Sequence, residues 1–355
     1  MMISSLSFNA ATRTTILKLQ NELNKANAEV GTGRHADVGL ALGRLTGEAV
    51  RYQSQASSIG RMLDSNKLVT TRLEMMDDTM AGLTNSAQSL SSSLTTMLST
   101  TGNAVGVTAV VDTAKASMQS MIGALNINVT GQYLFAGAQT DQMPMKDGSS
   151  QVADGFNAFL QAVGTATGTT VTAANVSPEV MEAYLGKDGY TAGGTTYKFD
   201  DLFADGASWD AWSNASDTPV VSRITKNETL DSSLSTNETA FRKLTAAYSL
   251  LTNAGLGEMS AETRSVVAKA ALTRVNEGIS GLTSLTAEVG TRINRVELAN
   301  TSLTAQKKLV DESIDRLEGV DYAEATLRVT TLETQLKASY EVTGRLSGLS
   351  LLNYL

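Results

Sequence analysis

Apolar side chains recur at helical spacing over long stretches near both ends of this chain, and this pattern constrains the fold most. Residues 45–97 repeat apolar or small side chains every three or four positions, and residues 279–317 and 325–349 do the same. Between these stripes lie all three prolines of the chain, Pro144, Pro178 and Pro219. Helices tolerate neither an internal proline nor an exposed apolar stripe, so we expect the first and last segments to pair. The prediction is a mainly α fold: a long antiparallel helical coiled-coil rod formed by the N- and C-terminal segments, with a small α+β domain inserted in the middle.

The character of the sequence changes along the chain in a way that suggests its division into parts. The stripe at 45–97 predicts a helix on the order of 80 Å long at ~1.5 Å per residue, and residues 107–125 predict a shorter helix that packs back on it. From about residue 141 to residue 230, Gly, Thr, Ser and Asp are frequent, and the runs 169–172 and 195–199 read as strands. We therefore expect three parts: terminal coiled-coil segments at 1–42 plus 325–355, a helical rod domain at 43–140 plus 231–324, and a variable outer domain at 141–230.

The terminal stripes are too thin to be stable alone. Burying about eight apolar side chains gains roughly 12 to 24 kcal/mol, whereas ordering ~30 residues of backbone costs roughly 30 to 60 kcal/mol. We therefore expect ends that are mobile in a monomer and fold against the equivalent ends of neighbouring subunits. A seam that closes a bundle within one chain is the alternative. The predicted assembly-interface residues are Ile16, Leu19, Leu23, Val30, Val329, Leu332, Leu336, Leu346 and Leu349.

Charge and composition exclude several classes of function. The formal net charge of −8, without a run of Lys and Arg, argues against nucleic acid as a partner. No apolar run approaches the ~18 residues that a membrane span needs, so we expect no membrane partner either. The chain has no cysteine, and its single histidine, His35, has no second imidazole or thiol to complete a site. We expect no metal, no cofactor and no enzymatic activity.

Several segments resemble the flagellin superfamily. The C-terminal run from Arg345 to Leu355, with Glu318–Ala325 upstream, is typical of it, and the regions Asn21–Leu23 and Gly290–Arg295 fit the same pattern. The segment Gly131–Gly137 (GQYLFAG), followed by Thr140 and Asp141, is similar to the members associated with the junction between hook and filament. The resemblance covers both ends and spares only the middle of the chain.

This resemblance implies a structural protein of the bacterial flagellum. Members have terminal segments that form an inner coiled-coil tube, a helical rod outside it and a variable outer domain, and they leave the cell unfolded, through the flagellar type III apparatus, without a cleaved signal. The implied location is extracellular. The implied partners are further copies of the chain in a ring, a neighbouring hook-associated protein, filament flagellin and an export chaperone.

Two other functions remain open from the sequence. A filament flagellin would share the rod and the terminal segments but would polymerise with itself. A surface adhesin or ligand-binding protein would use residues 141–230, through exposed Trp209 and Trp212 as stacking platforms, although a role of these tryptophans in the core of the small domain is the simpler interpretation.

Overall fold

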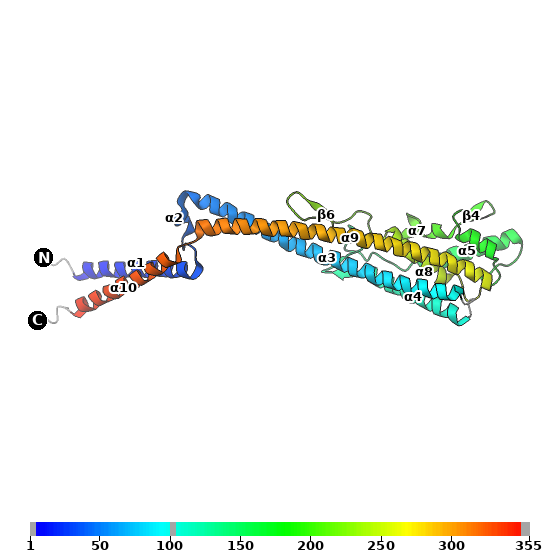
Figure 1. Ribbon diagram of the computed structural model, residues 1–355, viewed down its shortest axis with the longest axis horizontal. Coiled ribbons are helices and arrows are strands. Elements are labelled where there is room, and N and C mark those ends of the chain that lie inside the picture. The colour runs from blue at the N-terminus through cyan, green and yellow to red at the C-terminus, as the bar shows by residue number, and fades with distance from the viewer. Residues whose placement is uncertain (1–4, 100–103, 349–355) are drawn as a thin grey trace. The chain divides into compact units, whose positions relative to one another are not determined.

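The computed structural model describes residues 5–99 and 104–348 (Figure 1). Helices dominate, and the predicted mainly α fold with long helices near both ends is confirmed. The helices are α1 (Ser5–Thr32), α2 (Val38–Leu42), the 3-10 helix η1 (Gly43–Leu45), α3 (Thr46–Ser99), α4 (Ala104–Leu125), α5 (Ser149–Thr167), α6 (Pro178–Leu185), η2 (Phe199–Phe203), α7 (Ala207–Asp210), α8 (Thr239–Asn253), α9 (Ala261–Glu318) and α10 (Tyr322–Gly348). Among the described residues, no helix is both long and apolar enough to cross a bilayer.

The strands form three separate two-stranded antiparallel pairs. They are β1 (Asn128–Val129) with β2 (Gln132–Tyr133), β3 (Tyr190–Ala192) with β4 (Thr195–Tyr197), and β5 (Val221–Arg223) with β6 (Thr229–Asp231). Each pair joins neighbouring segments of the chain, so the strands are local hairpins and the long-range architecture depends on helices.

Contacts divide the chain into two compact units. The first comprises the described residues up to Leu63 and from Thr301 onward, and the second comprises residues 64–300. In the first unit α1 lies beside α10 (Figure 1), and the start of α3 packs on the end of α9. The apolar contacts of that second pairing come from Ile59, Leu303, Val310 and Ile314.

In the second unit α3 and α9 pack on each other, and α4 and α8 join them in one continuous apolar core. Leu73, Met76, Met80, Leu90 and Leu94 of α3 are fully buried, which is the stripe that the sequence predicts. Ser86 on α3 donates a hydrogen bond to Ser117 on α4 over 3.0 Å. The expected helix at residues 107–125 is therefore present as α4 and packs on α3.

The segment between α4 and α8 adds its own aromatic side chains to this core. Phe159 stacks on Tyr184 with ring centroids 3.9 Å apart, and Trp209 and Trp212 are almost fully buried. The alternative that these tryptophans form an exposed stacking platform is therefore wrong. Trp209 donates its indole N–H to the Asn237 side chain over 2.8 Å, which satisfies its polar group inside the core.

One of the two predicted strands is also wrong. Residues 195–197 form β4 as expected, whereas residues 169–172 are a loop. In this loop the Asn175 side chain accepts the Thr172 N–H over 2.7 Å and donates to the Thr170 carbonyl over 3.0 Å. The asparagine thus supplies local hydrogen bonds that replace a strand partner.

Candidate assembly interface

Helices α1 and α10 form an antiparallel pair in the first unit (Figure 1). The Gln20 side chain donates to the Tyr340 hydroxyl over 2.7 Å, and Arg328 reaches Glu29 over 3.2 Å. Because higher residue numbers in α1 meet lower numbers in α10, the two helices run in opposite directions. Helix α10 begins at a capped end, where the Asp321 carboxylate accepts the Ala323 N–H over 2.8 Å.

The predicted interface residues line the seam of this pair. Ala26 of α1 and Ala325 of α10 are the fully buried apolar members of the seam, at 1% and 3% exposed. The predicted positions on the same stripes are half-buried: Ile16, Leu19, Leu23, Val30, Val329, Leu332 and Leu336. Leu346 belongs to α10, but its side chain lies outside the description, and Leu349 lies outside the described residues. Their role in contacts between subunits stays a prediction.

Several large apolar side chains of the terminal pair lie outside this seam. Leu17 of α1 is 52% exposed, and Leu327 and Val342 of α10 are 68% and 49% exposed. Exposed apolar side chains of this size are available for contacts with another helix. The pair therefore has a seam that is closed within the chain and, outside it, exposed apolar side chains on both helices.

A polar cluster that the sequence analysis missed, here called the clasp, holds the connector between α1 and α2 to the corner between α9 and α10. It consists of two buried carboxylates, Glu29 and Glu318, and two arginines, Arg34 and Arg328. Arg34 donates to Glu318 over 3.3 Å, and Arg328 donates to Glu29 over 3.2 Å. Buried carboxylates require such partners because an unpaired buried charge is costly.

Backbone hydrogen bonds reinforce the clasp. The Val320 N–H donates to the Gly33 carbonyl over 3.0 Å, and the His35 N–H donates to the Glu318 carbonyl over 2.9 Å. The Ala36 N–H donates to the Glu29 carboxylate over 3.2 Å. The connector is thus fixed by both its backbone and its side chains.

The sequence does contain a signal for the two carboxylates. Glu29 follows Ala26 by three residues and Glu318 follows Ile314 by four, so each acidic residue interrupts an apolar stripe on its buried face. A charge at such a position is expected to have a paired partner, but the identity of that partner depends on the tertiary fold.

His35 has a structural position in this cluster. Its Nδ1 lies 3.8 Å from a Glu29 carboxylate oxygen, and its ring lines a small cavity of about 230 Å³ beside Glu324 and Arg328. Within the described residues, no group of histidine and acidic side chains has an arrangement that could hold a metal ion. The arrangement is suited to holding two helix pairs together.

Sequence comparisons assign the family. Residues 3–140 match the bacterial flagellin N-terminal helical region, and residues 272–355 match the bacterial flagellin C-terminal helical region. Together these regions cover more than half of the chain. The chain belongs to the bacterial flagellin family. No curated protein matches this flagellin-family chain significantly in a sequence search.

Two solved structures are similar to this flagellin-family protein. A putative flagellar hook-associated protein from Vibrio parahaemolyticus matches with a TM-score of 0.51 and 13% identity, covering 77% of this chain and 97% of that one. The FlgL protein of Bacillus cereus matches with a TM-score of 0.48 and 12% identity, covering 75% and 99%. At these identities the first likeness shows a shared fold. Family membership indicates a structural role in the flagellum.

Proposed function

We propose that this flagellin-family protein joins the flagellar hook to the filament. The observation that carries the proposal is the paired terminal helices, which leave Leu17, Leu327 and Val342 exposed outside their own seam. These side chains suit packing against equivalent helices of further subunits. The fold shared with the hook-associated protein of Vibrio parahaemolyticus, together with the Gly131–Gly137 segment, favours the junction role among the functions of the family.

In this proposal the chain assembles as a ring through its terminal segments. The apolar contacts of the inner tube would come from the seam residues Ile16, Leu19, Leu23, Val30, Val329, Leu332 and Leu336. Leu346 and Leu349 continue the same stripe along the sequence. One side of the ring contacts a neighbouring hook-associated protein and the other side contacts filament flagellin. The terminal segments, the helical rod domain and the variable outer domain would have the boundaries given above. The chain would travel unfolded through the flagellar type III apparatus with an export chaperone and function outside the cell.

Deletion of the protein tests the junction role directly. Electron microscopy of cells without it should show intact hooks that carry no filament, with filament protein released into the medium. Restoring the chain should restore filaments. Normal filaments on the deletion strain would contradict the proposal.

A filament flagellin is the remaining alternative, and seeding experiments separate the two functions. Purified junction protein should add to isolated hooks but should not extend into long filaments by itself. Filament flagellin should do both, so long filaments formed from this chain alone would assign it to the filament.

A further inference from the structure

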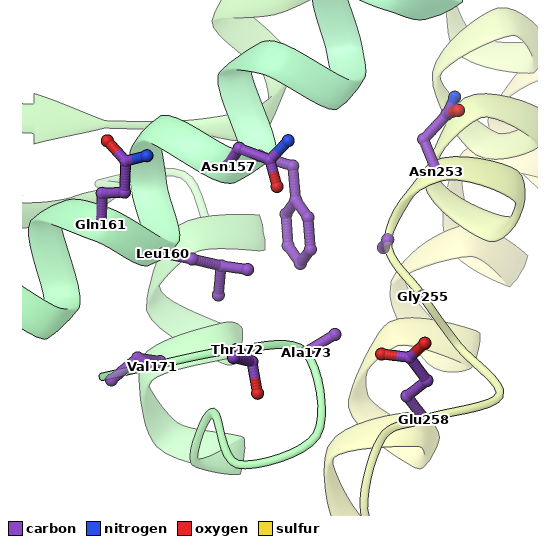
Figure 2. Close-up of a pocket in the computed structure, with 11 residues that line it drawn as sticks. Asn157, Leu160, Gln161, Val171, Thr172, Ala173, Asn253, Gly255 and Glu258 are labelled. Atoms are coloured by element: carbon purple, nitrogen blue, oxygen red, sulfur yellow. The ribbon is translucent and has the colours of Figure 1, made fainter. Parts of the chain in front are cut away.

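A pocket in the second unit lies between α5, the loop after it and the end of α8 (Figure 2). Its volume is about 480 Å³, within the range of small-ligand sites of roughly 300–1,000 Å³. The buried side chains of Phe156 and Leu160 and the methyl group of Ala173 provide apolar surface. Figure 2 shows Leu160 projecting between the walls and the Glu258 carboxylate directed toward the loop that carries Ala173.

The walls of this pocket are held by hydrogen bonds that do not depend on a ligand. The Asn175 side chain closes the loop from residue 170 to residue 175, and the Thr263 hydroxyl donates to the Val176 carbonyl over 2.9 Å. Gly255 has φ of +68°, and a Cβ there would lie 3.0 Å from Ala173, so glycine allows the two walls to approach. The pocket is therefore pre-formed, which lowers the cost of binding.

The polar groups at its rim indicate the chemistry of a ligand. Glu258 is the one charged side chain among the described residues that line the pocket, so a cation is favoured and an anion is disfavoured. Asn157 and Gln161 are exposed carboxamides one turn apart on α5. Their Cβ atoms are spaced by about 5–6 Å, close to the two-residue repeat of about 6.7 Å in an extended chain. A saccharide is less suitable because Phe156 is buried and offers no exposed ring face.

We propose that this pocket binds a short extended peptide segment that carries a lysine or an arginine. Asn157 and Gln161 pair with alternate backbone amides, Glu258 pairs with the cation, and an aliphatic side chain of the peptide contacts Leu160. The peptide belongs to a protein other than this chain, because a chain of net charge −8 is matched better by a basic partner than by a second acidic copy. This site is separate from the terminal helices on which the junction proposal rests.

Methyl NMR of the full-length protein tests this inference with defined probes. The probe is a capped pentapeptide, acetyl-Ser-Val-Lys-Val-Ser-amide, and the control has Glu in place of Lys. The lysine peptide should shift the methyl signals of Leu160 and Val171 at millimolar concentration, and the glutamate peptide should bind more weakly. Glu258→Gln should weaken the lysine peptide about 2- to 5-fold, as expected for an exposed ion pair.

Matched variants identify the origin of any effect. Glu262→Gln changes an exposed acidic residue of α9 that does not line the pocket and should leave binding unchanged. Asn157→Ala should weaken both peptides. Equal binding of the two peptides, shifts confined to methyl groups elsewhere, or no shift at millimolar peptide would overturn the inference. Pocket shifts that depend on protein concentration without peptide would also overturn it, because they would identify a second copy as the occupant.

Discussion

Gly137 ends a segment that is packed without spare room. It has φ of +56°, and a Cβ at this position would clash with the Ser216 carbonyl oxygen. The three residues before it, Leu134, Phe135 and Ala136, are fully buried. The Gly137 N–H also donates to the Leu234 carbonyl over 3.0 Å. Packing therefore accounts for both the buried run before Gly137 and the glycine itself.

Replacing Gly137 with alanine should destabilise the second unit by about 2–5 kcal/mol. A left-handed conformation costs alanine roughly 1–2 kcal/mol, and forcing a methyl group into packed backbone adds about 1–3 kcal/mol. Urea unfolding of the purified protein measures the change. Gly168→Ala is the matched control, because Gly168 has φ of +68° with open space around it and should lose only about 1–2 kcal/mol. Equal losses in the two variants would contradict the packing explanation.

Glu238, at the start of α8, should make stability depend on pH. Burial and the neighbouring Glu288 carboxylate raise the pKa of Glu238 above its ordinary value. The folded state therefore holds this proton more tightly than the unfolded chain does, and stability falls as pH rises between the two pKa values. Glu238→Gln should remove this loss and stabilise the protein at pH 7 relative to wild type, with little effect at acidic pH. Urea titrations at several pH values measure it, and a stability gain that is the same at acidic and neutral pH would contradict the assignment.

At the scale of elements, spacing predicts the helices well because their apolar faces persist over many turns. The strand expected at residues 169–172 fails for a local reason: three threonines favour a strand, but Asn175 closes the backbone on itself. The clasp could not be predicted from the sequence for a long-range reason. Glu29 and Arg328 are 299 residues apart, so no local pattern identifies them as a pair.

Removing one carboxylate of the clasp should loosen the connector. Glu318→Ala leaves Arg34 with Asp315 alone, so the backbone hydrogen bonds of His35 and Val320 should open more easily, by about 1–3 kcal/mol. Hydrogen exchange of these two amides measures the change. Glu312→Ala, on an exposed position of α9, is the control and should leave both rates unchanged. Unaltered exchange in Glu318→Ala would show that the backbone alone holds the connector.

At the scale of the whole molecule, the family and the helical architecture follow from the sequence. The sequence does not show which apolar residues of the terminal helices are buried in the seam between α1 and α10 and which are exposed outside it. The predicted residues are half-buried within one chain, and exposed apolar side chains such as Leu327 face elsewhere. Periodicity finds the stripe that is closed by α10, but single side chains outside the stripe carry no periodic signal.

Two substitutions in α10 should separate these two kinds of contact. Leu336→Asp places a charge in the seam and should both unpair α1 from α10 and block incorporation. Leu327→Asp changes an exposed position and should leave the pair intact while still reducing incorporation. Circular dichroism of the monomer and the amount of each variant on purified hooks measure these effects. Normal amounts of either variant on hooks would contradict assembly through the terminal helices.

The distance along the chain between the members of the clasp also affects when it can form. During synthesis Glu29 leaves the ribosome long before Arg328 has been made, and Arg34 leaves it long before Glu318 has been made. Until nearly the whole polypeptide has been made, the first buried carboxylate has no countercharge, so the earliest part of the chain is among the last to reach its folded surroundings. The clasp can therefore close only after residues 318–328 have been made.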